Sequence, residues 1–239
     1  MKSKIAAYIK LQNQPVAVIK TDTFPEGALQ FKEGKWGCVV AMLNAASKGR
    51  TAALSDKTLV CPGGKAGTGF GPFQTGITEY FLSTRGKGPK EGEFYKESPE
   101  LALQYMTGIP QIDAKEYLVL KPLSAVEDSD LPETIVFLVN ADQLSGLVTL
   151  ANYDQAEQDS VKIKFGSGCA QSLLYSLADS QKGQDTCTIG LTDPSARKCI
   201  DKDILSLSIP YSRFLEMESK ADGSFLSKET WKHISARII

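Results

Sequence analysis

Histidine is almost absent from this chain of 239 residues, because the only one is His233, near the C-terminus on a segment expected to form a helix surface. This scarcity argues against Ser-His-Asp and Cys-His nucleophilic systems, which need an imidazole as the base. It also argues against metal sites built from several histidines. Acid–base chemistry would fall to carboxylates, lysines or tyrosines, and no paired-carboxylate motif stands out in the sequence.

The chain also lacks an excess of either charge and any long apolar run. Lys plus Arg is 27 against 28 for Asp plus Glu, which argues against a nucleic-acid footprint or a polybasic membrane surface. No segment approaches the roughly 20 apolar residues that a membrane helix needs. Lys4, Lys10 and Lys20 interrupt every early stretch that would resemble a signal-peptide core. We expect a cytoplasmic protein without nucleic-acid or membrane partners, and the sequence leaves its oligomeric state open.

Cysteine is present in an odd number and at wide spacing. The five residues are Cys38, Cys61, Cys169, Cys187 and Cys199, and no C-x-x-C pair occurs. Without a secretion signal this pattern argues against a disulfide framework. Reduced thiols remain, either as small buried hydrophobes or as ligands and nucleophiles.

The hydrophobic pattern predicts strands that are separated by helices. We expect strands at 16–19, 117–120, 135–139, 161–165, 188–191 and 204–209, an extended stretch within 51–60, and helices at 3–11, 38–48, 98–106, 142–153, 168–177, 193–197, 214–217 and 228–236. The alternation favours an α/β or α+β fold in which a mixed sheet is layered with helices. It does not decide whether all strands are parallel.

The chain reads as a single compact domain over residues 1–239, with weak internal halves at 1–125 and 126–239. The best linker candidates are the short stretches 86–98 and 125–133. A faint echo relates WGCVVAML at 36–43 to SGCAQSLL at 167–174, and both segments place a Gly-Cys pair at the start of an expected helix.

Three of the cysteines occupy settings that suit a ligand. Cys38 and Cys169 begin expected helices, where free N–H groups and the helix dipole lower the pKa of a thiol. Cys61 begins a glycine-rich loop that lets a ligand approach closely. Three such thiolates are a candidate set for an iron–sulfur cluster, or for one tetrahedral soft metal ion. Burial as a small hydrophobe is the alternative for each of them, and is the favoured interpretation for Cys187 and Cys199.

The glycine loop at 61–71 is dense enough to form an anion-binding nest of backbone N–H groups. Its candidate ligand-binding residues are Gly63, Gly64, Gly67 and Gly69. The loop is not a dinucleotide fingerprint, because G-x-G-x-x-G does not occur between a strand and a helix, and it is not a Walker A loop. A tight irregular turn is the alternative interpretation.

A second candidate anion site is the stretch DPSARK at 193–198. The expected helix start offers backbone donors, the Ser195 hydroxyl and the Arg197 guanidinium. If the strands at 161–165 and 188–191 are parallel, Cys169 and this stretch share one edge of the sheet. The alternative is a capped helix with a solvated arginine. Asp142, at the start of another expected helix, is interpreted as an N-cap.

These segments together resemble a known family. Gly37-Cys38, AASKGRTA at 45–52, CPGG at 61–64 through Gly69-Phe70-Gly71, KPL at 121–123, VNADQL at 139–144, ANY at 151–153, Gly168-Cys169 and GLTDPSAR at 190–197 follow in the order of the archaeal and bacterial cysteine-rich family called domain of unknown function 169. The resemblance implies that Cys38, Cys61 and Cys169 are the motif cysteines and that Cys187 and Cys199 are incidental. Ala141 stands where the family pattern has a proline. The family brings no settled activity.

Three hypotheses on function follow, in this order. The first is a protein that binds an iron–sulfur cluster or a metal through the thiolates of Cys38, Cys61 and Cys169, with one coordination position open to a small molecule. The second is a binder of a small anionic ligand, or a thiol enzyme without metal. The third is a structural or interaction module. The sequence does not decide whether the protein is an enzyme.

Overall fold

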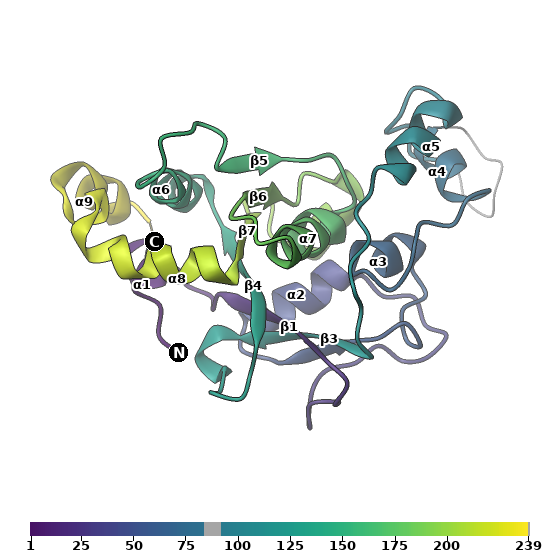
Figure 1. The fold of residues 1–239 in the computed structure, drawn as a ribbon, viewed down its shortest axis with the longest axis horizontal. Helices are drawn as coiled ribbons and strands as arrows, with labels where there is room; N and C mark the ends of the chain where they lie inside the picture. The colour runs from purple at the N-terminus through teal and green to yellow at the C-terminus, as the bar shows by residue number, and fades with distance from the viewer. Residues whose placement is uncertain (84–91, 239) are drawn as a thin grey trace.

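A mixed seven-stranded sheet organises the computed structural model, which describes residues 1–83 and 92–238 (Figure 1). The strands lie in the order β2-β3-β1-β4-β7-β6-β5. Their bounds are β1 Val16–Thr21, β2 Ala52–Leu54, β3 Tyr117–Pro122, β4 Pro132–Val139, β5 Val161–Ile163, β6 Cys187–Gly190 and β7 Leu205–Pro210. Among the described strand pairs, β5 and β6 run parallel and the other five pairs are antiparallel. The α/β expectation is confirmed, and the strands near 161 and 188 do pair in parallel.

The central strands are buried on both faces, which explains the nearly continuous apolar sequences of β1 and β4, whereas Lys162 and Ile163 of the edge strand β5 are exposed. In β4, Ile135 and Phe137 pack into one core while Val136 and Leu138 pack into the other. In β1, Ala17 and Val18 divide in the same way. The period-two alternation of a strand therefore supplies two cores at once.

Helices cover both faces of this sheet. Their bounds are α1 Lys4–Tyr8, α2 Val39–Ser47, α3 Pro62–Gly67, α4 Thr78–Ser83, α5 Pro99–Thr107, α6 Ala141–Ala151, α7 Tyr175–Gln181, α8 Tyr211–Lys220 and α9 Glu229–Ala236. Short non-α turns are η1 Leu123–Ala125, the π-helical η2 Ala170–Leu174, and the 3-10 turns η3 Pro194–Cys199, η4 Ala221–Gly223 and η5 Phe225–Ser227. One core contains residues of α1, α6, α8 and α9, and the other contains residues of α2, η2 and α7. Figure 1 shows α4 and α5 together at one end of the molecule.

The two expected halves contribute separate parts of the sheet. Residues 1–125 supply β1, β2 and β3, residues 126–239 supply β4 to β7, and the antiparallel pair β1–β4 joins them. Residues 86–91 of the first candidate linker lie outside the described residues. Of the extended stretch expected within 51–60, only Ala52–Leu54 forms a strand.

Helix starts follow the predicted capping chemistry with one correction. Ser98 caps α5 with its side chain, and Pro99 occupies the first turn. The expectation for Asp142 is wrong, because Asn140 is the N-cap of α6 and forms a capping box with Gln143. Asp142 instead pairs with Arg237, which holds the pKa of its carboxyl below the usual range.

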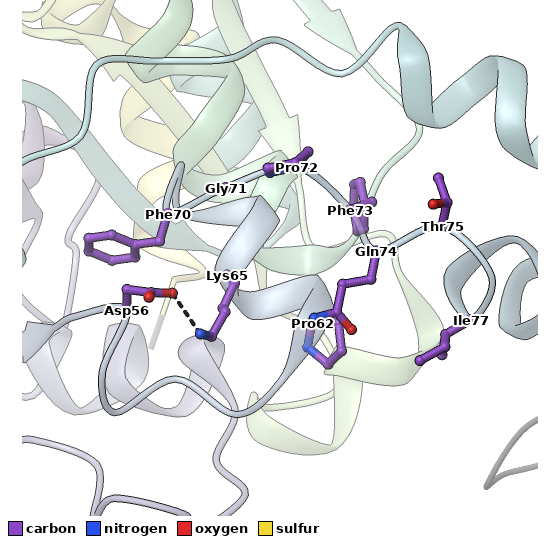
Figure 2. A pocket seen from close by; sticks show the side chains of 10 residues that line it. All are labelled: Asp56, Pro62, Lys65, Phe70, Gly71, Pro72, Phe73, Gln74, Thr75 and Ile77. Carbon is purple, nitrogen blue, oxygen red and sulfur yellow. Dashed lines mark ion pairs between the residues drawn. The ribbon is translucent and has the colours of Figure 1, made fainter.

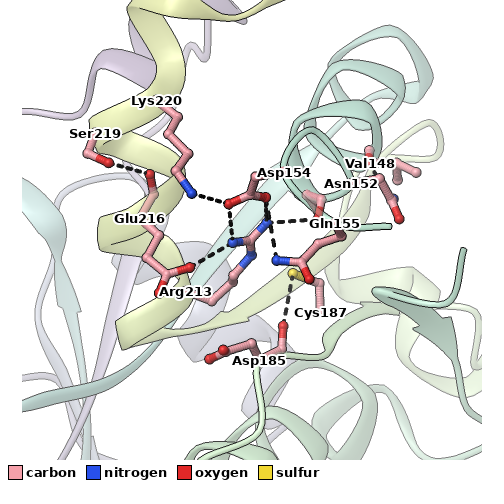
Figure 3. Close-up of polar contacts among 11 residues, drawn as sticks. Val148, Asn152, Asp154, Gln155, Asp185, Cys187, Arg213, Glu216, Ser219 and Lys220 are labelled. Carbon is pink, nitrogen blue, oxygen red and sulfur yellow. Dashed lines mark hydrogen bonds and ion pairs between the residues drawn. The ribbon is translucent and has the colours of Figure 1, made fainter. Parts of the chain in front are cut away.

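Helix α8 carries a buried charged side chain, that of Arg213. The guanidinium of Arg213, a side chain that is 1% exposed, donates to Asp154, to Glu216 at 2.7 Å and to the carbonyl of Ala151 at 3.0 Å, and Lys220 also pairs with Asp154 (Figure 3). We call Arg213, Asp154, Glu216 and Lys220 the Arg213 network. Its charges are matched and its donors are satisfied, as a buried guanidinium requires.

Candidate cysteine site

Three cysteines that are far apart in sequence begin three helical segments at one place in the fold. Cys38 is the N-cap of α2, Cys61 is the N-cap of α3, and Cys169 precedes η2. They are electrostatic neighbours: the charge of Cys38 affects the titration of Cys61, and those of Cys61 and Cys38 affect that of Cys169. The structure therefore brings together the three residues that the sequence singles out as ligands.

The contact between α3 and η2 holds two of these thiols in place. The Cys169 Sγ donates to the Gly63 carbonyl at 3.3 Å and lies 3.4 Å from the Ser167 Oγ. Gly67 makes this approach possible, because a Cβ at that position would lie 2.9 Å from the Cys169 Sγ and 2.8 Å from the Ala170 amide nitrogen. Glycine at position 67 thus serves close helix packing.

The prediction of an irregular loop at 61–71 is wrong over its first half, where Pro62–Gly67 forms α3. The amide of Gly64 donates to the Cys61 Sγ at 3.4 Å. The Gly69 amide donates to the Ala66 carbonyl at 3.2 Å, and Gly69 itself has a φ of +84° just beyond the helix. The Gly64 amide therefore faces a cysteine sulfur of its own chain.

Cys199 lies beside Cys38, which the sequence did not indicate. It ends η3, and the neighbouring Cys38 thiol contributes to the raised pKa of Cys199. The Asn44 side chain donates to the Cys199 carbonyl at 3.1 Å and so ties this turn to α2. We call Cys38, Cys61, Cys169 and Cys199 the cysteine cluster. The wide sequence separation of Cys199 from Cys38 gave no signal of this proximity.

Cys187, in contrast, lies in β6 within the opposite core and is fully buried. This placement agrees with its interpretation as a core thiol. Burial raises the pKa of the Cys187 thiol to about 12.

Burial also governs the thiols of the cysteine cluster. It raises the pKa of Cys169 to about 12, and it raises the pKa of Cys61, with further contributions from neighbouring thiols and Asp193. Burial and the Cys38 thiol raise the pKa of Cys199 to about 11. The expected lowering of the pKa at Cys169 is wrong, because desolvation outweighs the effect of the helix start.

The second predicted anion site serves local structure. The Asp193 carboxylate accepts from the Gly168 amide at 2.8 Å and from the Ser195 amide and hydroxyl, each at 2.9 Å. The Arg197 guanidinium donates to four carbonyls, those of Leu191, Asp201, Lys202 and Ile204. Arg197 thus fixes the turn that carries Cys199. Ser195 also approaches Tyr95, whose pKa is raised by burial and by the Asp193 charge.

Two unusual backbone features lie next to the cysteine cluster. Leu191 is a buried non-glycine residue with a φ of +62°, two residues before Asp193. The π-helical turn η2 starts directly after Cys169. Left-handed backbone in a bulky residue is costly, and both features are frequent near functional sites.

A pocket of about 550 Å³ lies along α3 (Figure 2). Its lining includes Pro62, Lys65, Phe70 and Gly71, so the segment at 61–71 forms one wall. Figure 2 shows Lys65 directed toward Asp56, and the ion pair measures 2.6 Å. None of the cysteines lines this pocket.

Within residues 1–83 and 92–238, no three His, Cys, Asp or Glu side chains are arranged to hold a metal ion. In the same part of the chain, every helix is too short or too polar to cross a membrane.

Comparison with known families identifies one match. The model of domain of unknown function 169 (DUF169), described as uncharacterised ArCR, matches residues 4–220. No curated protein and no solved structure matches the chain. The match spans α1 to α8 and thus contains all cysteines of the cluster. The chain belongs to the DUF169 family.

Proposed function

We propose that this protein binds an iron–sulfur cluster through the thiolates of Cys38, Cys61 and Cys169. The observation that carries the proposal is the meeting of these three thiols, from residues 38, 61 and 169, at the starts of three helical segments. Iron–sulfur clusters are held by cysteine thiolates. Three protein ligands would leave one iron position open to a small molecule.

The surroundings of the thiols support a metal-bound state. The backbone amide of Gly64 donates to the Cys61 sulfur, and such an N–H group stabilises negative charge on a ligating thiolate. Burial keeps the free Cys169 thiol protonated at neutral pH. A bound metal cation supplies the positive charge that deprotonates a coordinating thiol. A bound iron–sulfur cluster would therefore offset the free-energy cost of desolvating the thiolates.

A multi-iron cluster and a single metal ion need different spacings between the cysteine sulfurs. A tetrahedral ion with bonds of about 2.3 Å needs sulfur atoms about 3.8 Å apart. No such group of three ligands exists among the described side chains. The cysteine sulfurs around a cubane cluster are more widely spaced, roughly 6–7 Å apart.

The hypothesis of an anion-binding or metal-free thiol protein has less support. The Arg197 guanidinium is occupied by backbone carbonyls, and Lys65 at the pocket on α3 is paired with Asp56. The raised pKa values of Cys61, Cys169 and Cys199 leave little thiolate for nucleophilic attack at neutral pH. A purely structural module has no observation of its own in its favour.

The experiment is anaerobic reconstitution with ferrous iron and sulfide, followed by iron and sulfide analysis and visible absorbance. Wild-type protein is expected to show a thiolate-to-iron charge-transfer band. Cys61→Ala and Cys169→Ala should each lose it. Cys187→Ala is the matched control, since Cys187 is a buried thiol in the opposite core, and it should load as wild type does. A colourless wild-type protein, or equal loading of Cys61→Ala, would contradict the proposal.

A further inference from the structure

Ser167 lies against the sulfur of Cys169, one of the three proposed ligands. The Ser167 Oγ is 3.4 Å from the Cys169 Sγ, and both residues belong to the segment that leads from β5 into η2. The Gln171 amide donates to the Ser167 carbonyl at 2.9 Å, and the Gly168 amide donates to the Asp193 carboxylate at 2.8 Å. These backbone bonds hold the Ser167 hydroxyl and the Cys169 sulfur in a fixed relative position.

The neighbouring hydrogen bonds decide which of these two groups is the donor. The Cys169 Sγ donates its hydrogen to the Gly63 carbonyl at 3.3 Å, and a carbonyl can only accept. The Ser167 Oγ accepts from the Ala170 amide at 3.3 Å, so its own hydrogen remains available. Ser167 is therefore the donor and the Cys169 sulfur the acceptor. A ligating thiolate has no S–H group, and its negative charge strengthens a bond of this direction.

The donor at Cys169 differs in kind from the donor at Cys61. The Cys61 Sγ accepts from the Gly64 backbone amide at 3.4 Å, a group that belongs to the main chain. The donor to Cys169 is a side chain, which a substitution at position 167 removes or keeps. Burial raises the pKa of Cys169, and the Ser167 hydrogen bond works against that rise, as a donor to the sulfur should.

We propose that Ser167 is a positioning residue of the cysteine site, whose hydroxyl donates to the Cys169 thiolate and raises the reduction potential of a bound iron–sulfur cluster. This role rests on the proposed function, whereas the hydrogen bond between Ser167 and Cys169 does not. Hydrogen bonds to the sulfurs help to set the potential of an iron–sulfur cluster. A donor withdraws negative charge from the sulfur and so favours the reduced cluster, which carries one more electron. Ser167 acts through Cys169 and needs no contact with iron.

Ser172, within the π-helical turn η2, provides a matched control. Its hydroxyl is fully buried and lies 2.9 Å from the Ser206 Oγ of β7. Ser172→Ala thus removes a hydroxyl of the same size from the same turn, and the bond that it breaks leads to the sheet. Ser167→Thr keeps a hydroxyl at position 167 and is the conservative variant. Far-UV circular dichroism verifies that each variant is folded.

The first test examines the hydrogen bond in metal-free, reduced protein. Urea titrations of wild type, Ser167→Ala, Cys169→Ala and the double variant form a double-mutant cycle. We expect Cys169→Ala to cost less stability in the Ser167→Ala background than in wild type. The lost bond from the Ala170 amide is common to both variants without Ser167 and cancels in the cycle. Additive losses would overturn the proposal, whether or not the protein binds a cluster.

The second test measures the midpoint potential of the reconstituted protein in an anaerobic dithionite titration followed by visible absorbance. At a fixed solution potential, Ser167→Ala should lower the ratio of reduced to oxidised cluster about tenfold, which is a midpoint about 59 mV lower for one electron. Ser167→Thr and Ser172→Ala should keep the wild-type midpoint.

An unchanged midpoint in Ser167→Ala, or an equal shift in Ser172→Ala, overturns the proposal. Failure of Ser167→Ala to load while Ser167→Thr loads would make Ser167 a requirement for binding, and would overturn the tuning role. If wild type does not load, the proposed function and the tuning role both fail, and the double-mutant cycle still decides on the hydrogen bond.

Discussion

The two faces of the sheet both bury ionisable groups, but they provide them with different partners. Beneath α8, Arg213 meets Asp154 and Glu216, and its charge is balanced. On the opposite face, the cysteine cluster is surrounded by other thiols and by Asp193, which carries a negative charge. A complete charge balance indicates a structural role. In the proposed function, a bound cation would supply the positive charge that the thiolates of the cysteine cluster need.

The largest expected effect tests the structural side of this comparison. Arg213→Met should leave Asp154 without its buried partner and lower the free energy of unfolding by about 3–5 kcal/mol. Lys220→Met is the control, because the Lys220 side chain is 42% exposed and such pairs contribute about 0–1 kcal/mol. Chemical denaturation measures both. Equal losses of unfolding free energy in the two variants would mean that the burial of Arg213 does not account for its contribution to stability.

A smaller effect is expected where α3 meets Cys169. Gly67→Ala places a Cβ 2.9 Å from the Cys169 Sγ and should cost about 1–3 kcal/mol of stability by overpacking. The Gly67→Ala variant should also bind less of the proposed iron–sulfur cluster. Gly63→Ala, in the same helix, places its Cβ 3.9 Å or more from any neighbour and should be neutral or slightly stabilising. A neutral Gly67→Ala would show that α3 is free to move away from Cys169.

The two faces of the sheet should also contribute differently to the stability of the protein at low pH. The Arg213 guanidinium beside Asp154 holds the pKa of that carboxyl well below its usual range. A lowered pKa stabilises the fold above the unfolded value of about 3.9, and this contribution is lost as pH falls further. Wild-type stability should therefore decline below about pH 4. Asp154→Asn, although less stable at neutral pH, should show a shallower decline in urea titrations across that range.

The smallest effect appears in alkali and compares Cys169 with Cys187. Both thiols have a pKa raised to about 12. A raised pKa means that stability falls as pH rises from the unfolded value of about 8.5 toward the folded value. Cys169→Ser and Cys187→Ser should each reduce this slope in metal-free protein. Cluster loading should remove the contribution of Cys169 alone, and an equal change at Cys187 would argue against the proposed site.

Much of the fold followed from local pattern. The alternation in 135–139 predicted β4, and the Ser98-Pro99 pair predicted the start of α5. The glycine loop was misread because glycine favours turns over helices. Packing of Gly67 against Cys169 and capping by Cys61 stabilise α3 nonetheless. Asp142 was misread because Asn140, two residues earlier, forms the capping box.

The sequence by itself determined the local elements and the identity of three candidate thiols, because periodicity, caps and family motifs are properties of neighbouring residues. Only the tertiary structure decided that the sheet is largely antiparallel, that the Asn44 side chain binds the Cys199 carbonyl, and that Arg197 binds the carbonyls of a loop. These are contacts between segments far apart in the chain. The pKa of Cys169 belongs with them, because desolvation depends on all surrounding atoms.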